Sequence, residues 1–261
     1  INFQNRLYPM VNQMKNMIKD KDIGKIYSVH GGYLQDWLLY DYDFNWRLLS
    51  EKGGKARTVG DIGSHWLDIA EYITGLRVTE LIAEFSTFHK KRKKFKDSIK
   101  TFAGSSDSNM EFEMMDIDTE DYVSLMFKFD NGAVGNAVLT QMFAGKKNKI
   151  SVFVSGSEKS LEWDTDDLSN IIIGNRMKPN EILTKDPSLL HPLTMKLSSY
   201  PGGHMEGYPD AFKQVFKEFY EKIENRDIQT NFGTFKDGLR QMQLAEKIYE
   251  SAIERKWVHV D

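Results

Sequence analysis

A series of strand-like segments in the middle of the chain constrains the fold more than any other feature. Residues 122–129 (YVSLMFKF) and 133–143 (AVGNAVLTQMF) flank the turn Asp130–Gly132. The first segment alternates as a half-buried strand does, and Asn-Gly is a strong signal for a type I′ hairpin turn. Three more segments, KISVFVSG, KSLEWD and NIIIGN, follow at short intervals. Strands joined in series by tight turns pair mostly antiparallel, so the sequence predicts an antiparallel meander.

Helical patterns lie on both sides of this meander. Four segments carry apolar residues at helical spacing: 8–18, 61–75, 208–223 and 235–253. Two further strand-like segments precede the meander, at 25–35 and 78–88. This combination predicts an α+β fold in which helices pack on one face of an open, mainly antiparallel β-sheet.

The whole chain, residues 1–261, is expected to form one domain. With 40% hydrophobic residues it is long enough to bury a substantial core. Residues 90–120 differ in composition, because the basic run KKRKKFKDSIK is followed by Gly, Ser and Asn and then by the acidic run EFEMMDIDTED. We interpret this segment as a solvated, charged insertion between two strands. The net charge of −3 does not favour a nucleic-acid partner.

Composition and absent motifs exclude several kinds of chemistry. Without cysteine the chain has no disulfide, thiolate metal site or cysteine nucleophile. Neither GxGxxG nor GxxxxGK[ST] occurs, so the chain has no phosphate-binding loop of a known type, and no GxSxG turn indicates a serine hydrolase. No apolar run reaches the roughly 18 residues of a membrane span, so we expect no membrane partner and a cytoplasmic location.

The stretch GDIGSHWLD, residues 60–68, is the first candidate site. Asp61 and His65 are four residues apart, which on a helix brings their Cβ atoms to about 5–6 Å, so the carboxylate could orient the imidazole. A capping aspartate followed by an interior histidine gives the same pattern. A metal site built on His65 and Asp68 is the weaker alternative, because no HExxH or similar spacing occurs, and we predict no metal.

Two loops offer further candidates. Residues 35–47 (QDWLLYDYDFNWR) interleave aromatic rings with Asp, Asn and Arg, which suits a hydroxyl-rich ligand, although tryptophans in a loop also commonly fill a small core. Residues 201–212 (PGGHMEGYPDAF) place two glycines before His204, Glu206 and Tyr208. That segment is equally consistent with a ligand-binding loop and with an ordinary loop before a helix.

Several motifs together resemble one known family. QNRLYP near the start, NWR, Gly53–Gly54, DIGSHWLD, QDW, GGHMEGYPDAF and the meander are similar to the carboxy-terminal domain of the glucose-fructose oxidoreductase, inositol dehydrogenase and rhizopine catabolism (Gfo/Idh/MocA) family. The resemblance covers nearly the whole chain. It implies an NAD(P)-dependent oxidoreductase of sugars or polyols, in which an amino-terminal Rossmann domain binds most of the NAD or NADP. The second half of such an enzyme carries substrate residues and an oligomer interface, so the resemblance implies that residues 1–261 are one substrate-binding and oligomerisation domain.

Carried over residue by residue, the resemblance implies that His65 is the general acid/base, with Asp61 as its close partner. Trp46 and Arg47 match a pair that reaches the nicotinamide end of the cofactor. The weaker matches are Asn5 near the nicotinamide and Trp37 and His204 as substrate contacts. The family's Glu-Lys-Pro motif, whose lysine assists proton transfer, does not occur. This chain alone is therefore expected to be inactive.

The resulting hypothesis is that His65 takes the proton of a sugar hydroxyl while hydride leaves the same carbon. An ordinary imidazole pKa of about 6.5 suits that exchange. An alternative from another class is a non-catalytic sugar-binding or dimerisation module, whose uncovered apolar sheet face pairs with a second copy. In both cases the partners are a sugar or polyol and a copy of the chain, in a homo-oligomer.

Overall fold

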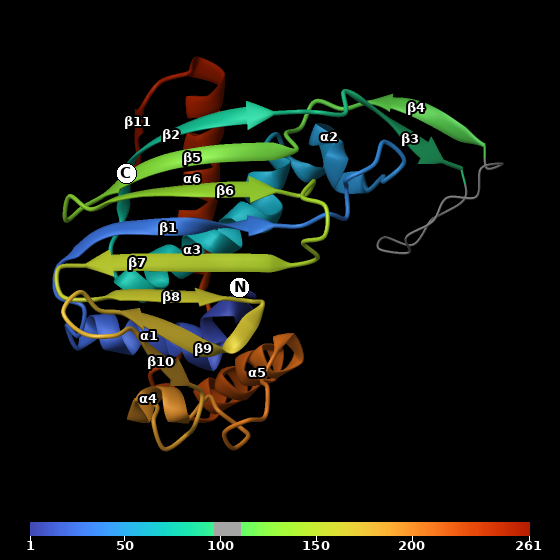
Figure 1. Cartoon of the computed structure of the whole chain (residues 1–261). Coiled ribbons are helices and arrows are strands. Elements are labelled where there is room, and N and C mark those ends of the chain that lie inside the picture. Colours follow the sequence, from blue (N-terminus) through green and yellow to red (C-terminus); the bar gives the residue numbers. More distant parts are fainter. Residues whose placement is uncertain (97–110) are drawn as a thin grey trace.

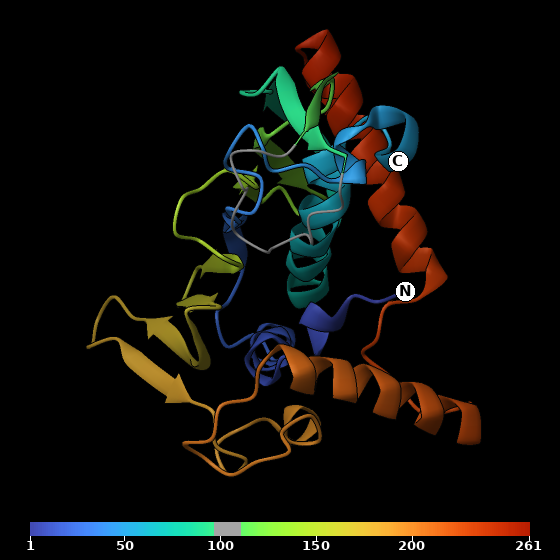
Figure 2. The ribbon, with the colours of Figure 1, turned by 90° about the vertical axis from the view of Figure 1, so that its right-hand side faces the viewer.

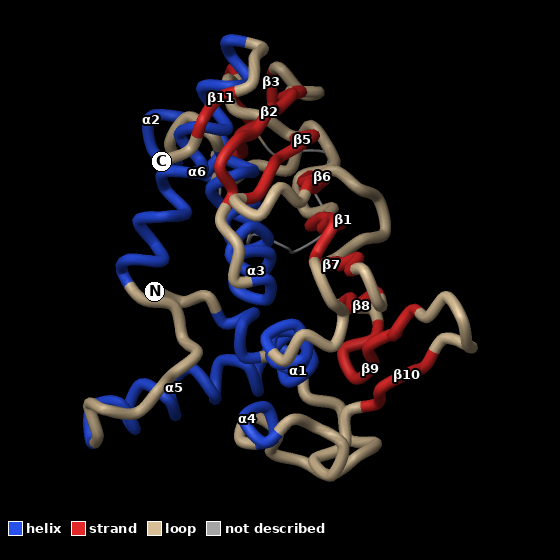
Figure 3. Tube along the Cα trace, turned by 90° about the vertical axis from the view of Figure 1, so that its left-hand side faces the viewer, coloured by secondary structure: helices blue, strands red, loops and turns tan. Residues whose placement is uncertain are grey.

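Helices cover one face of a nine-stranded sheet and leave the other face open (Figures 1 and 3). The structure, a computed structural model, describes residues 1–96 and 111–261. The strand order is β10-β9-β8-β7-β1-β6-β5-β2-β11, and every neighbouring pair is antiparallel except β1 with β6. The predicted α+β fold with an open, mainly antiparallel sheet is therefore confirmed.

The elements follow the predicted segments closely. The strands of this sheet are β1 (Ile26–Leu34), β2 (Val78–Ser86), β5 (Tyr122–Phe129), β6 (Val134–Thr140), β7 (Lys149–Gly156), β8 (Ser160–Asp164), β9 (Asp167–Gly174), β10 (Glu181–Thr184) and β11 (Val258–His259). The helices are α1 (Pro9–Lys19), α2 (Ser50–Gly53), α3 (Ser64–Thr74), α4 (Pro192–Met195), α5 (Tyr208–Glu224) and α6 (Phe235–Glu254). Shorter helical turns are η1 (Gln4–Leu7), η2 (Trp46–Leu48) and η3 (Val59–Gly63).

Strand β5 illustrates how alternation places the core. Val123, Leu125 and Phe127 are buried, whereas Ser124 and Met126 between them are exposed. Each buried apolar side chain of this size contributes about 1.5–3 kcal/mol. The buried face lies under α3, which packs on β1, and α6, which packs on β2, and Figure 2 shows α6 running along this side of the sheet with α5 below it.

The β5–β6 turn differs from the type I′ turn that the sequence predicts. Gly132 has φ 83°, but Asn131 does not share a positive φ, as a type I′ turn requires. The N–H of Gly132 donates to the carbonyl of Phe129 at 3.0 Å, and the side chain of Asn131 accepts from the N–H of Ala133 at 2.8 Å. The prediction of the turn type is wrong, because one additional loop residue lets glycine alone take the left-handed conformation.

Helix α3 lies directly on the centre of the sheet. Its Trp66 is fully buried, and the indole Nε1 donates to the carbonyl of Ser151 on β7 at 2.9 Å. This approach needs Gly31 on β1, because a Cβ there would lie 2.0 Å from the Ser151 oxygen. The helix ends at Gly75, which has the left-handed φ of 69° expected at that position.

The charged segment is only partly described. Strands β3 (Lys91–Phe95) and β4 (Phe112–Asp116) pair in a separate two-stranded sheet that projects from one end of the large sheet (Figure 1). Residues 97–110 of the expected insertion lie outside the described residues. In the described ends of this segment, Lys91 and Glu113 are exposed, whereas Arg92 is fully buried and Ile117 packs with Leu38 and Leu48 in a small second core.

That second core also holds residues 36–49, here called the aromatic loop. Its Trp37 and Phe44 pack against the Leu38–Leu48–Ile117 cluster. The loop tryptophan thus fills part of a small core, as one of the two interpretations of the sequence expected. Within residues 1–96 and 111–261, no helix combines the length and apolar character needed to cross a membrane.

Candidate active site

The segment that carries Asp61 and His65 begins with a π-helical turn. In η3 the N–H of Ser64 donates to the carbonyl of Val59, five residues earlier, and regular α-helix follows from Ser64. Such turns are rare and often occur at functional sites. The wider turn means that Asp61 and His65 are not neighbours on one regular helix, as their spacing had suggested. The turn lies at the carboxyl ends of β1 and β6, where Gly63 faces Leu139.

Two side chains hold the Asp61 carboxylate. Its Oδ2 accepts a hydrogen bond from Gln141 Nε2 at 2.6 Å, and its Oδ1 lies 3.4 Å from Arg47 Nε. The guanidinium of Arg47 in turn lies 4.6 Å from the centre of the Trp46 ring, which is half exposed. Within the described residues no hydrogen bond joins Asp61 to His65. Asp61 therefore connects the end of β6 to the NWR segment.

His65 is partly exposed at the start of α3. Its Nδ1 is buried and has no hydrogen-bond partner among the described residues, and Phe3 packs edge-on against the ring at 5.6 Å. Burial lowers the pKa of His65, and the charge of Asp61 opposes that shift. Burial therefore favours the neutral imidazole, which is the form that accepts a proton.

A chain of hydrogen bonds runs along the carboxyl end of β1. Trp37 Nε1 donates to Gln35 Oε1 at 2.7 Å, and Gln35 Nε2 donates to Asn148 Oδ1 at 2.9 Å. The same Asn148 oxygen accepts from the Tyr33 hydroxyl at 2.6 Å. Burial raises the pKa of Tyr33, and the nearby Asp61 charge adds to the effect. This chain fixes the orientation of the Trp37 ring.

The remaining candidate residues lie on neighbouring segments. Asn5, on η1, is buried, and its Nδ2 lacks a partner among the described residues. His204 is exposed and makes a hydrogen bond with the carbonyl of Gly202 at 3.3 Å. No hydrogen bond or ion pair in the described part of the chain links His204 to Asp61 or His65. The structure thus groups Asp61, Arg47 and Trp46 closely and leaves His204 on a separate loop.

Glu206 anchors that separate loop from inside. Its carboxylate is buried and accepts from Lys185 Nζ at 2.6 Å and from the N–H of Ser199 at 2.6 Å. Lys185 is equally buried. Glu206, which the sequence marked as a possible ligand group, is therefore a structural residue of the loop.

His65 and Asp68 are the two residues of the metal site that the sequence offers as its weaker alternative. Asp68 instead pairs with Arg6, whose Nε donates to its Oδ2 at 2.8 Å, and burial raises the pKa of Asp68 to about 6 against the effect of Arg6. Across residues 1–96 and 111–261, no three His, Asp or Glu side chains lie together as metal ligands would.

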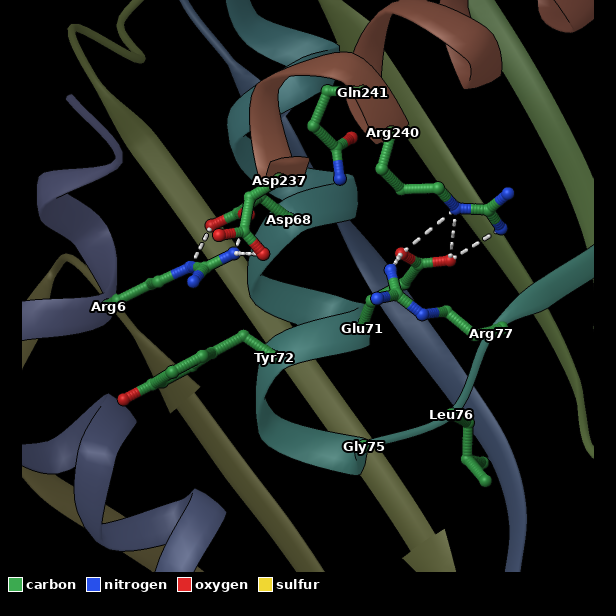
Figure 4. Close-up of a pocket in the computed structure, with 10 residues that line it drawn as sticks. All are labelled: Arg6, Asp68, Glu71, Tyr72, Gly75, Leu76, Arg77, Asp237, Arg240 and Gln241. Atoms are coloured by element: carbon green, nitrogen blue, oxygen red, sulfur yellow. Dashed lines mark hydrogen bonds and ion pairs between the residues drawn. The ribbon is translucent and has the colours of Figure 1, made fainter. Parts of the chain in front are cut away.

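A pocket on the helical side is built from paired charges (Figure 4). Arg6 bridges Asp68 on α3 and Asp237 on α6, with the second contact at 3.0 Å. The Glu71 carboxylate forms ion pairs with Arg77 Nη1 at 2.8 Å and with Arg240 Nη2 at 2.9 Å. Three cations and three anions compensate one another here. The cluster therefore clamps α3 to η1 and α6, and the candidate active site lies at the other end of α3.

Sequence reasoning missed two residues near Asp61: Gln141, which donates a hydrogen bond to its carboxylate, and Tyr33, whose pKa is raised by burial and also by the Asp61 charge. Gln141 directly follows β6, and Tyr33 occupies the end of β1. The only available signal was a polar residue next to the end of a strand, which many surface positions share.

Comparison with known proteins places these features in a family. Residues 11–162, more than half of the chain, match the GFO/IDH/MocA C-terminal domain. The chain belongs to this family. The resemblance inferred from DIGSHWLD and the accompanying motifs is confirmed.

Curated members of the GFO/IDH/MocA family align over almost the whole chain. Levoglucosan dehydrogenase of Pseudarthrobacter phenanthrenivorans is 28% identical over 266 residues, which cover 99% of this chain and 65% of the relative. Glucose-6-phosphate 3-dehydrogenase of Bacillus subtilis is 20% identical and covers 95% of this chain and 63% of the relative. The chain thus spans about two thirds of the length of the curated relatives it matches.

Solved structures agree with this family fold. The apo form of levoglucosan dehydrogenase superimposes with a TM-score of 0.87 at 25% identity and covers all of this chain and 66% of that one. An oxidoreductase domain protein from Kribbella flavida gives 0.83 at 25% identity, with the same coverage. A levoglucosan dehydrogenase complex with NADH and levoglucosan gives 0.84 at 24% identity, covering 100% and 65% of the two chains.

Proposed function

We propose that this chain is the substrate-binding and catalytic part of an NAD(P)-dependent oxidoreductase that acts on a hydroxyl or ketone of a sugar or polyol. His65 is its general acid/base, assisted by Asp61. The observation that carries the proposal is a partly exposed imidazole whose buried Nδ1 has no partner among the described residues, near the Asp61 carboxylate at the end of the sheet. Relatives named as dehydrogenases of levoglucosan and glucose-6-phosphate support the substrate class.

The neutral ring can act as a base toward a sugar hydroxyl. His65 takes the proton as the O–H bond breaks, the same carbon loses hydride, and the C–O bond becomes a carbonyl. The reverse path returns the proton to a ketone oxygen. Asp61 favours the imidazolium that forms, because its negative charge lies close enough to raise the pKa of His65. Gln141 and Arg47 keep that carboxylate in place.

A nicotinamide cofactor supplies the hydride acceptor in such a reaction. Two features of this chain fit its nicotinamide end: the exposed Trp46 ring with Arg47 stacked on it, and the unpartnered, buried Nδ2 of Asn5. The chain has no glycine-rich phosphate loop of a known type. We therefore propose that most of the cofactor is bound by a Rossmann domain, and that residues 1–261 alone are inactive.

Trp37 and His204 are the proposed substrate contacts. Aromatic rings pack well on the apolar faces of sugars, and the Gln35–Asn148 chain fixes the Trp37 ring. His204 is an exposed side chain on a loop that the buried Lys185–Glu206 pair holds in place.

A second candidate is a sugar-binding or dimerisation module without catalysis. The open sheet face favours it, since exposed apolar side chains there need a cover: Met126, Val134, Phe153 and Ile172. We propose that a second copy of the chain covers this face. The pairing is compatible with the enzymatic function, so the two candidates differ only in turnover.

The test is turnover by the full-length gene product with NAD and NADP on a panel of sugars and polyols that includes levoglucosan. We expect His65→Asn to lower kcat by about 10²- to 10⁴-fold while the melting temperature is retained. His191→Asn is the control, because His191 is also partly buried but caps α4. Unchanged turnover in His65→Asn would remove the assignment, and sugar binding without turnover of any substrate would favour the module.

A further inference from the structure

Glu120 sets the start of the turn η3. Its buried carboxylate accepts the N–H of Arg57 at 2.9 Å and the N–H of Val59 at 3.0 Å. Its carbonyl accepts the hydroxyl of Thr58 at 2.7 Å. Backbone donors at the beginning of a helix have no partner within the helix, so an outside acceptor determines where that helix begins. Here one carboxylate, 61 residues away in the chain, provides it.

Asp121 joins the same turn to the β3–β4 arm. One carboxylate oxygen, Oδ2, accepts the N–H groups of Phe88 at 2.8 Å and His89 at 3.2 Å, just before β3. The other, Oδ1, accepts Arg57 Nη2 at 2.6 Å and Arg92 Nη2 at 3.0 Å. All three charged side chains are almost completely buried.

Arg92 extends the connection to the aromatic loop. Its Nη1 donates to the carbonyls of Tyr40 at 2.7 Å and Asp43 at 3.1 Å. Both carbonyls lie between Trp37 and Trp46 in the chain. One guanidinium therefore fixes the backbone of the loop that holds the proposed sugar and nicotinamide contacts.

The Glu120–Asp121 pair also contacts the end of β6. The carbonyl of Asp121 accepts the hydroxyl of Thr140 at 2.9 Å, and the next residue, Gln141, holds the Asp61 carboxylate. Glu120 and Asp121 thus contact η3, the start of the arm and the end of β6, and Arg92 extends these contacts to the aromatic loop.

The charge cluster is not arranged for stability alone. Two cations and two anions are buried, and within the described residues Arg57 Nη1 and Arg92 Nε have no hydrogen-bond partner. Burial lowers the pKa of Arg92 and raises the pKa of Glu120, so each charged form is disfavoured by desolvation. An apolar core of the same size is often at least as stable as a buried ion cluster, whereas charged groups restrict the geometry.

We propose that Glu120 and Asp121, with Arg57 and Arg92 as their cations, are positioning residues for the reaction. They hold η3, which carries Asp61 at the entry to α3, in a fixed place relative to the aromatic loop. The base and the aromatic contacts then meet one sugar in one geometry. This inference rests on the proposed function.

Kinetics of the full-length gene product test it. Glu120→Gln replaces one acceptor oxygen by an NH2 group that must face a backbone N–H, so η3 shifts, and we expect kcat to fall by about 10- to 100-fold with little change in KM. Arg92→Lys keeps the charge but loses the forked geometry that serves both the loop and Asp121, and we expect KM to rise severalfold. Arg240→Lys is the matched control in the clamp of Figure 4 and should change neither constant.

Hydrogen exchange supplies a readout that does not need activity. Glu120→Gln should speed exchange in residues 57–65 and Arg92→Lys in residues 36–49, while α6 keeps its protection in both. If the wild-type protein turns over no substrate, the proposed function fails and exchange alone decides the positioning. If both variants fold and have the same kcat, KM and hydrogen exchange as the wild type, the positioning role is overturned and the proposed function stands. Should Glu120→Gln not fold, Thr58→Val removes only the hydroxyl bond to Glu120 and should lower kcat by a smaller factor.

Discussion

Gln141→Leu isolates the hydrogen bond that anchors Asp61 to the sheet. A hydrogen bond to a charged group contributes about 1.5–3 kcal/mol, and this one is short, at 2.6 Å. The Asp61 side chain is 27% exposed, so water can replace part of the lost hydrogen bond, and the variant loses about 1 kcal/mol of the energy that holds the carboxylate. If that energy holds the carboxylate for the transition state, kcat/KM falls about fivefold.

The assay compares kcat/KM with the melting temperature in the full-length gene product. Leucine is similar in size to glutamine and also removes the unpartnered Gln141 Oε1, so we expect folding stability to change by less than about 1 kcal/mol. Gln241→Leu is the control, since Gln241 is buried on α6 and its Oε1 also lacks a partner within the described residues. Wild-type kcat/KM in Gln141→Leu would refute the anchoring argument, and an equal fall in both variants would indicate general loosening.

Three further predictions concern stability and assembly. Folding lowers the pKa of His65, so below the ordinary imidazole pKa of about 6.5 the unfolded chain binds more protons and the free energy of unfolding falls as the pH decreases. Urea unfolding of His65→Asn at several pH values should show a shallower fall than the wild type. An equal pH dependence in the two proteins would contradict this. Lys185→Met leaves the Glu206 carboxylate buried without its cation and should lower the free energy of unfolding by about 3–5 kcal/mol, measured by thermal unfolding. Adding Glu206→Gln removes the unpaired charge and should restore much of that stability. A small loss in the single variant would count against the importance of the pair. Met126→Glu with Phe153→Glu charges the open sheet face and should reduce the mass measured by light scattering to that of one chain, whereas an unchanged oligomer would exclude this interface.

The secondary structure could be predicted because its signals are local. Alternation in 122–129 and helical spacing in 235–253 each reflect one buried face, and the structure has β5 and α6 there. The turn between β5 and β6 was predicted with the wrong type, because Asn131–Gly132 fits two kinds of turn. The choice depends on the additional loop residue and on the contact from the Asn131 side chain to Ala133.

The candidate site could be predicted only in part, because its supporting contacts are distant in sequence. DIGSHWLD marked Asp61 and His65, but Gln141 lies 80 residues from Asp61. Arg92 lies in a basic run, and such a run predicts solvent-exposed side chains. Its burial depends on Asp121 and on backbone carbonyls of the aromatic loop, which no local pattern reveals.

The position of β1 has a consequence for how the chain folds. β6 and β7 follow each other in sequence, yet β1 lies between them, parallel to one and antiparallel to the other. During synthesis β1 is made more than a hundred residues before either of its neighbours is complete. Contacts of such long range slow folding, and without β1 two bare strand edges would invite aggregation. Removing residues 26–34, which form β1, is therefore expected to disrupt the middle of the sheet rather than its margin.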